Sequence, residues 1–215
     1  MNDNKTYLNL LNKELSTLGI LLRRNSAVSH TFEFSLGRGL SYFDFWSLYY
    51  EKNWYDFQFK DMSLLSFFES NDKITTCSYL GCPVQDIITE EEYYKSEDLY
   101  GVGIPYGDYV SSLPKLENVS YVRFDSADKQ YINGLHPLNH FHFGYNQDSR
   151  IGVCYHIGIV AFAAMILRQY YPDSWKKVLK TPRDYPTLYS FKSKLVNVED
   201  DYYRDLDCSH DLYLK

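Results

Sequence analysis

Hydrophobic positions along the chain form two helical patterns. Near the N-terminus, leucines recur at spacings of three and four residues, at Leu8, Leu11, Leu15, Leu18 and Leu22. Because such spacings place side chains on one face of an α-helix, they predict an amphipathic docking helix over Tyr7 to Arg24. A second segment is almost entirely apolar from Ile157 to Leu167 and predicts a helix over Tyr155 to Tyr171, ended by Pro172. We expect this second helix to form the floor of the hydrophobic core.

Alternation of apolar and polar residues predicts strands elsewhere. The segment from Val119 to Asp125 alternates, turns through residues 126–134, and returns as a strand over Asn139 to Phe143, which together predict an antiparallel hairpin. Shorter segments at residues 31–36 and 56–60 predict two further strands, separated by a helix over residues 41–52 that Ser41 can cap. Residues 70–118 are rich in Asn, Asp, Glu, Gly, Pro and Ser, and we expect loops there with a short helix around residues 90–94.

These elements predict an α+β fold. We expect a small, mostly antiparallel sheet packed against the apolar helix over residues 155–171 and against the N-terminal amphipathic helix. Residues 1–196 are predicted to form a single domain, followed by an acidic, tyrosine-rich tail over residues 197–215. With 45% apolar and 18% aromatic residues among 215, the chain can bury a substantial core.

Three features predict a cytoplasmic protein without membrane association. The longest apolar run, from Ile157 to Leu167, is about half of the roughly 20 residues needed to span a bilayer. The N-terminus shows no basic segment leading into apolar residues, so no secretory signal is expected. Four scattered cysteines are expected to be reduced thiols rather than a disulfide framework: Cys77, Cys82, Cys154 and Cys208.

The charge of the chain is unevenly distributed. The net charge is −6, yet residues 114–196 carry 11 Lys and Arg against 6 Asp and Glu, a local balance of +5. A polyanionic partner such as nucleic acid therefore stays possible for this part of the chain. An ordinary solvated face of lysines and arginines explains the same imbalance, because charge asymmetry is common in proteins.

Half of the six histidines fall within seven residues, at His136, His140 and His142. Side chains alternate along a strand, so His140 and His142 are expected to share one face. If the predicted hairpin pairs antiparallel, Arg123 and Asp125 lie on that same face. The sequence therefore predicts a site at which two imidazoles, a carboxylate and a guanidinium meet.

The first interpretation of this site is metal-free, acid–base cleavage of RNA. One imidazole would remove the proton of the 2′-hydroxyl and the other would protonate the leaving oxygen, with His140 and His142 as the pair and Asp125 orienting one ring. Histidine suits this reaction because its ordinary pKa of about 6.5 lets both protonation states coexist near neutral pH. Phosphate-binding residues would be Arg123, Arg150 and, as a weaker candidate next to Pro137, His136.

Two other interpretations stay open. The histidines could bind a metal ion through His136, His140 and His142, with Asp125 as a fourth ligand or an outer partner. The cluster could equally be structural, a buried imidazole pair hydrogen-bonded to Asp125 and to the backbone, with ion-paired arginines.

A set of motifs resembles a known protein family. The chain joins an Arg-x-Asp strand at Arg123, a His-Pro-x-x-His-x-His strand from His136 to His142, the pair Arg150-Ile151, and an aliphatic helix ending in Tyr171-Pro172. In this combination it resembles the bacterial domain-of-unknown-function family 2290, and two upstream segments, residues 61–68 and 79–83, fit the same family. The resemblance covers most of the chain, but the family carries no assigned activity.

A looser similarity links residues 121–168 to the TumE-like toxins of toxin–antitoxin pairs, which also join an Arg-x-Asp strand to a His-x-His strand. This similarity implies a defence or toxin-like setting. We therefore predict a metal-independent ribonuclease that needs no cofactor and binds RNA or another nucleic acid. The alternative is a non-catalytic subunit or antitoxin-like module that holds a protein partner, or another copy of itself, through tyrosine-rich surfaces and its acidic tail.

Overall fold

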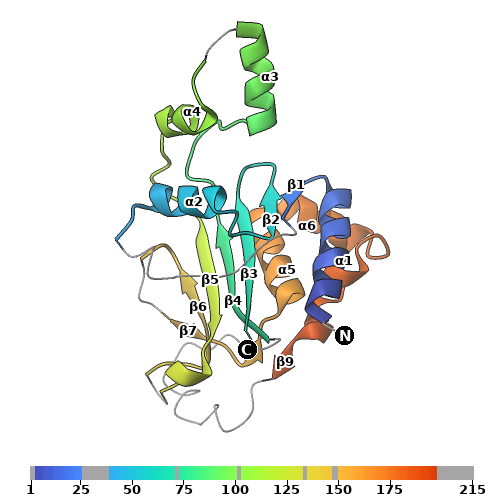
Figure 1. Ribbon diagram of the computed structural model, residues 1–215. Helices are drawn as coiled ribbons and strands as arrows, with labels where there is room; N and C mark the ends of the chain where they lie inside the picture. Colours follow the sequence, from blue (N-terminus) through green and yellow to red (C-terminus); the bar gives the residue numbers. More distant parts are fainter. Residues whose placement is uncertain are drawn as a thin grey trace.

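The computed structural model describes residues 3–25, 39–70, 73–100, 103–132, 135–146 and 150–197. It combines helices with a central antiparallel sheet (Figure 1), which confirms the predicted α+β class. The predicted strand at residues 31–36 and the predicted tail after residue 197 lie outside the described residues. Within the described residues, no helix is both long and apolar enough to cross a bilayer.

The α-helices are α1 (Asp3–Leu18), α2 (Tyr42–Glu51), α3 (Glu90–Tyr100), α4 (Tyr106–Ser112), α5 (Ile159–Tyr170), α6 (Pro172–Lys180) and α7 (Pro186–Tyr189). Two short 3-10 helices are η2 (Asp128–Gln130) and η3 (Phe191–Lys194). The strands are β1 (Leu21–Arg24), β2 (Phe57–Phe59), β3 (Leu64–Ser70), β4 (Lys73–Leu80), β5 (Tyr121–Ser126), β6 (Asn139–Phe143), β7 (Ile151–Gly152), β8 (Tyr155–His156) and β9 (Val196–Asn197).

Strands β1 to β7 form one sheet in chain order, each antiparallel to its neighbour, while β8 and β9 pair separately. The predicted hairpin is present as β5 and β6, and the histidine strand has the predicted bounds. The long strands β3, β4 and β5 lie in the middle of the sheet (Figure 1). Residues on these strands are therefore held by neighbours on both sides.

One face of the sheet is apolar and is covered by α1 and α5. Cys77, Val122, Phe124 and Phe141 lie on this face, and each is at most 3% exposed. Helix α5 packs against them through side chains such as Phe162, which is fully buried. The apolar helix thus forms the floor of the main hydrophobic core, as predicted.

Helix α2 covers one end of the opposite face (Figure 1). The Ser41 side chain accepts a hydrogen bond from the Asp44 backbone N–H, so Ser41 caps α2 as predicted. Aromatic side chains of α2, among them Trp46 and Tyr49, join a second core cluster that includes Leu80 and Tyr121 of the sheet. The sheet is therefore buried on both faces.

The N-terminal helix ends earlier than predicted. Helix α1 stops at Leu18, and Gly19 adopts a φ of 75°, a left-handed conformation that ends helices because glycine has no side chain to clash. The following residues form β1, which pairs with β2. The prediction that the helix continues to Arg24 was therefore wrong, since Leu22 belongs to the sheet.

Residues 70–118 hold more structure than predicted. The expectation of loops was wrong for β4, which spans Lys73–Leu80 and pairs with both β3 and β5. Helix α3 continues to Tyr100, beyond the short helix predicted there, and α4 was not predicted. In the other direction, α5 begins at Ile159 rather than Tyr155, because residues 155–156 pair with β9 as a strand.

Candidate functional site

The face of the sheet that α2 covers changes from apolar to polar along the strands. Three rows of cross-strand neighbours run across it: Leu64, Leu80 and Tyr121; then Ser66, Ser78, Arg123 and His142; then Phe68, Thr76, Asp125 and His140. Alternate residues of a strand share a face, so all three rows lie on the side of α2. The polar rows form the candidate site.

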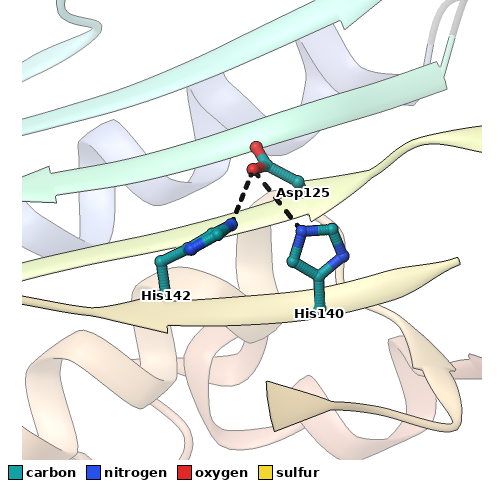
Figure 2. Close-up of side chains that lie close together, drawn as sticks. All are labelled: Asp125, His140 and His142. Atoms are coloured by element: carbon teal, nitrogen blue, oxygen red, sulfur yellow. Dashed lines mark ion pairs between the residues drawn. The ribbon is translucent and has the colours of Figure 1, made fainter. Parts of the chain in front are cut away.

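The β5–β6 pairing brings together the residues that the sequence selected. Arg123 lies opposite His142, and Asp125 lies opposite His140. Figure 2 shows the Asp125 carboxylate from β5 and both imidazoles from β6 converging on one point. The predicted common face for these four residues is confirmed.

Asp125 is the centre of this cluster. Its Oδ2 atom accepts a hydrogen bond from Arg123 Nε at 2.8 Å, and its Oδ1 atom accepts one from the Thr76 hydroxyl at 3.1 Å. The same Oδ2 lies 3.4 Å from Nε2 of His142 and 3.8 Å from Nε2 of His140. Four side chains from β4, β5 and β6 therefore surround one carboxylate.

The second nitrogen of each imidazole lies in a different environment. Nδ1 of His140 is 3.0 Å from the Pro137 carbonyl oxygen, and because a carbonyl only accepts, this nitrogen donates. In the neutral ring, Nε2 of His140 then carries a lone pair. Nδ1 of His142 is buried and has no hydrogen-bond partner among the described residues. Nε2 of His142 therefore faces the carboxylate, and Nδ1 makes no hydrogen bond with the described residues.

Burial and neighbouring charges have opposite effects on the pKa of His140 and on that of Asp125, and both pKa values end below their ordinary values. Burial lowers the pKa of His140 to about 4, against the opposing attraction of Asp125, so this imidazole is neutral at neutral pH. Burial alone would raise the pKa of Asp125, but the hydrogen bond from His142 and the charge of Arg123 outweigh it and leave that pKa below its usual value. The carboxylate is therefore ionised beside a neutral imidazole.

The arginines occupy separate places. The Arg123 side chain belongs to the cluster and is 24% exposed, so it reaches the surface while it pairs with Asp125. Arg150 is exposed and lies near His136, where burial and the Arg150 charge together lower the histidine pKa. The His136 ring packs edge-on against His140 at 4.8 Å between centroids. Arg150 and His136 thus lie at the rim, beside the other residues selected from the sequence.

Sequence reasoning missed Thr76. It lies on β4, in a stretch read as loop, and supplies the hydrogen bond to the second oxygen of Asp125. The available signal was the alternation of Thr76 and Ser78 with Cys77 and Tyr79, which is typical of a strand with one polar face.

Three residues of the cluster could hold a metal ion. One donor atom each from Asp125, His140 and His142 lies within 4.8 Å of the others. His136, which the sequence suggested as a further ligand, is outside this donor group although its ring contacts His140. Chemically, the cluster can therefore move protons through imidazole or bind a cation.

Comparison with known protein families gives a match over most of the chain. A family model described as an uncharacterized conserved protein (DUF2290) matches residues 10–205. No curated protein and no solved structure gives a significant match to the chain. The similarity to TumE-like toxins gains no support from these comparisons and stays a prediction.

Proposed function

The chain belongs to the DUF2290 family of uncharacterized conserved proteins, and we propose that it is a cytoplasmic, metal-independent ribonuclease of a defence or toxin-like system. The observation that carries the proposal is the arrangement of His142. One ring nitrogen faces the ionised Asp125 carboxylate, and the other is buried without a hydrogen-bond partner among the described residues. A carboxylate that fixes an imidazole in this way leaves the opposite nitrogen as a base.

In this mechanism His142 takes the proton of the attacking 2′-hydroxyl through Nδ1, which is buried in the free chain and has to become accessible when RNA binds. The imidazolium that forms is stabilised by Asp125, whose Oδ2 lies 3.4 Å from Nε2. Asp125 is in turn held by the Thr76 hydroxyl and by Arg123. These contacts fix the ring and its tautomer before substrate arrives.

His140 completes the acid–base pair. Because its pKa is lowered to about 4, the ring is neutral near pH 7 and lacks the extra proton that a general acid must donate. A phosphate beside the ring would raise that pKa, because a nearby negative charge favours the protonated imidazole. His140 can then protonate the leaving oxygen. Its position opposite Asp125 keeps it next to His142, with ring centroids 4.9 Å apart.

The arginines bind the phosphate. Arg123 is partly exposed. Its guanidinium, which carries five N–H donors, pairs with Asp125 through Nε and also interacts with Tyr121. In the proposed mechanism it stabilises the charge that develops on the phosphorane. Arg150, exposed beside His136, guides the neighbouring phosphate of the chain.

A second candidate function is favoured by the burial of the imidazoles. His140 is 2% exposed and His142 is 5% exposed, which also suits a structural cluster that stiffens a protein-interaction module. In that case the chain is a non-catalytic subunit or antitoxin-like protein that holds another protein or a second copy of itself. The two candidates differ in whether the isolated chain turns over RNA.

The test is cleavage of a labelled mixed RNA pool by purified chain in excess chelator. We expect cleavage by the unaltered chain and by His156→Gln, a matched control that changes a histidine outside the cluster. Cleavage is expected to fall at least about 100-fold in His142→Gln and in His140→Ala, because loss of a general acid or base has that scale. Absence of cleavage by the folded chain, with or without added zinc or magnesium, would contradict the ribonuclease proposal and favour the interaction module.

A further inference from the structure

The donor atoms around Asp125 have the spacing of a metal site. Tetrahedral zinc with bonds near 2.0–2.1 Å sets its ligand atoms about 3.3 Å apart. Nε2 of His142 and Nε2 of His140 lie 3.4 Å and 3.8 Å from Oδ2 of Asp125, and the three donor atoms lie within 4.8 Å of one another. Small side-chain movements would bring all three to one ion.

The outer contacts of these residues are those that orient metal ligands. A ligating histidine usually donates its other ring N–H to a carbonyl or carboxylate, and Nδ1 of His140 donates to the Pro137 carbonyl. A ligating carboxylate is usually hydrogen-bonded as well, and Oδ1 of Asp125 accepts from the Thr76 hydroxyl. The remaining donor atoms of His140 and Asp125 face each other (Figure 2).

We infer that Asp125, His140 and His142 bind one divalent first-row transition-metal ion, with Zn²⁺ as the natural occupant of a site with two imidazoles and one carboxylate. Imidazole nitrogen suits zinc, copper, nickel and iron, whereas magnesium and calcium take oxygen ligands. The site is nearly closed, since both histidines are at most 5% exposed. Any fourth ligand is therefore a water or a group that enters with it.

The positive charge of Arg123 is expected to weaken binding of the ion. Its Nε donates to Oδ2 of Asp125 at 2.8 Å, so a cation on this oxygen meets a positive charge and must displace or share that hydrogen bond. Removing the guanidinium is therefore expected to strengthen binding. This direction is opposite to that expected from removing a ligand, and it separates metal binding from a general loss of folding.

Metal binding and acid–base use of His142 exclude each other, a consequence that rests on the proposed function. With Nε2 bound to an ion, the single proton of the neutral ring occupies Nδ1, which then has no lone pair to accept a proton. A bound ion therefore switches the proposed cleavage off. Metal binding itself is measured without RNA, so a failure of the ribonuclease proposal leaves this inference standing.

The test is a titration of metal-stripped chain with Zn²⁺ against a chromophoric chelator, with Co²⁺ absorption as a second readout of nitrogen and oxygen coordination. We expect one ion per chain, with affinity at least about tenfold weaker in His140→Gln, because even outer partners of metal ligands change affinity by 10- to 100-fold. Affinity is expected to rise in Arg123→Gln and to stay unchanged in the control His156→Gln.

Two results would overturn the inference. One is an unaltered chain that takes up neither Zn²⁺ nor Co²⁺ in a one-to-one complex. The other is a folded His140→Gln chain that binds both ions as tightly as the unaltered chain does. Weakening in His140→Gln together with strengthening in Arg123→Gln supports the site, because misfolding would weaken both variants.

Discussion

The two faces of the central sheet bury very different side chains from the same strands. On β5, Phe124 points to the face of α1 and α5, and its neighbour Asp125 points to the other face. On β6, Phe141 and His140 divide in the same way. Three of these side chains are at most 3% exposed, and the Asp125 side chain is 16% exposed. The same strands therefore carry apolar side chains on one face and ionisable side chains on the other.

We assign the stability of the fold mainly to the apolar face and the chemistry of the candidate site to the polar face. Burying apolar surface stabilises a fold by roughly 25 cal/mol per Å². Burying a hydrogen-bonded polar group contributes much less, because it gives up its contacts with water. Replacing a buried charged cluster by well-packed apolar side chains is often neutral for stability or even stabilising. Buried ionisable residues are typical of functional sites, where residue types often differ from those that stability alone would favour.

The largest effect on stability is expected on the apolar face. Phe162 of α5 is fully buried and its ring packs against Phe67 and Phe141. Phe162→Ala is expected to lower the free energy of unfolding by about 3–5 kcal/mol, through lost burial and the cavity that remains. Urea unfolding measures this, with Leu179→Ala as the control, since Leu179 is 53% exposed. A loss below about 1 kcal/mol for Phe162→Ala would contradict the assignment of stability to this face.

Asp125→Asn is the next largest change. The amide keeps the size of the side chain but removes the charge that pairs with Arg123 and faces both imidazoles. We expect unfolding free energy to fall by about 1–3 kcal/mol, the scale for partly buried polar groups that lose a partner. The same urea experiment applies, with His156→Gln as the control. An unchanged midpoint would mean that Asp125 makes no net contribution to the cluster.

Thr76→Val removes a single hydrogen bond from the polar face. The two side chains have nearly the same shape, and the substitution removes only the hydroxyl that donates to Oδ1 of Asp125. The expected loss of unfolding free energy is about 0.5–1.5 kcal/mol. In the same variant we expect weaker cleavage, because the carboxylate that orients His142 is less firmly held. A cleavage rate equal to that of the unaltered chain would remove Thr76 from the mechanism.

His142→Gln is expected to have the smallest effect on stability. Glutamine can still donate from its side chain toward Asp125, and Nδ1 of His142 has no hydrogen-bond partner among the described residues to lose. Unfolding free energy is therefore expected to change by less than about 1 kcal/mol, while cleavage falls at least about 100-fold. A variant that loses stability as Phe162→Ala does would instead identify His142 as a structural residue.

Local patterns in the sequence predicted the parts of the fold with a strong periodicity. The apolar run of α5 and the alternation of β6 led to a nearly correct helix and a correct strand. The prediction failed where one local signal competed with another. The leucine spacing continues to Leu22, but α1 ends just before Gly19. Leu22 instead belongs to β1, which pairs with β2, a strand far away in the chain.

The part of the candidate site that lies on the β5–β6 hairpin could be predicted from the sequence. Pairing of β5 with β6 placed Arg123, Asp125, His140 and His142 together, and it follows from alternation alone. Thr76 could not be placed in this way, because its contact depends on the pairing of β4 with β5 across a separation of 49 residues. The burial of both imidazoles likewise follows from packing of segments distant in sequence, which strand patterns do not specify.

The most direct test of the account is the chemistry of the RNA ends produced in excess chelator. Attack by the 2′-hydroxyl, with His142 as base, predicts fragments with a cyclic 2′,3′-phosphate and a free 5′-hydroxyl. It also predicts that a 2′-O-methyl RNA of the same sequence stays intact and that His142→Gln yields no fragments. Fragments with a 5′-phosphate, cleavage of the 2′-O-methyl RNA, or equal cleavage by folded His142→Gln would contradict the proposed reaction centre.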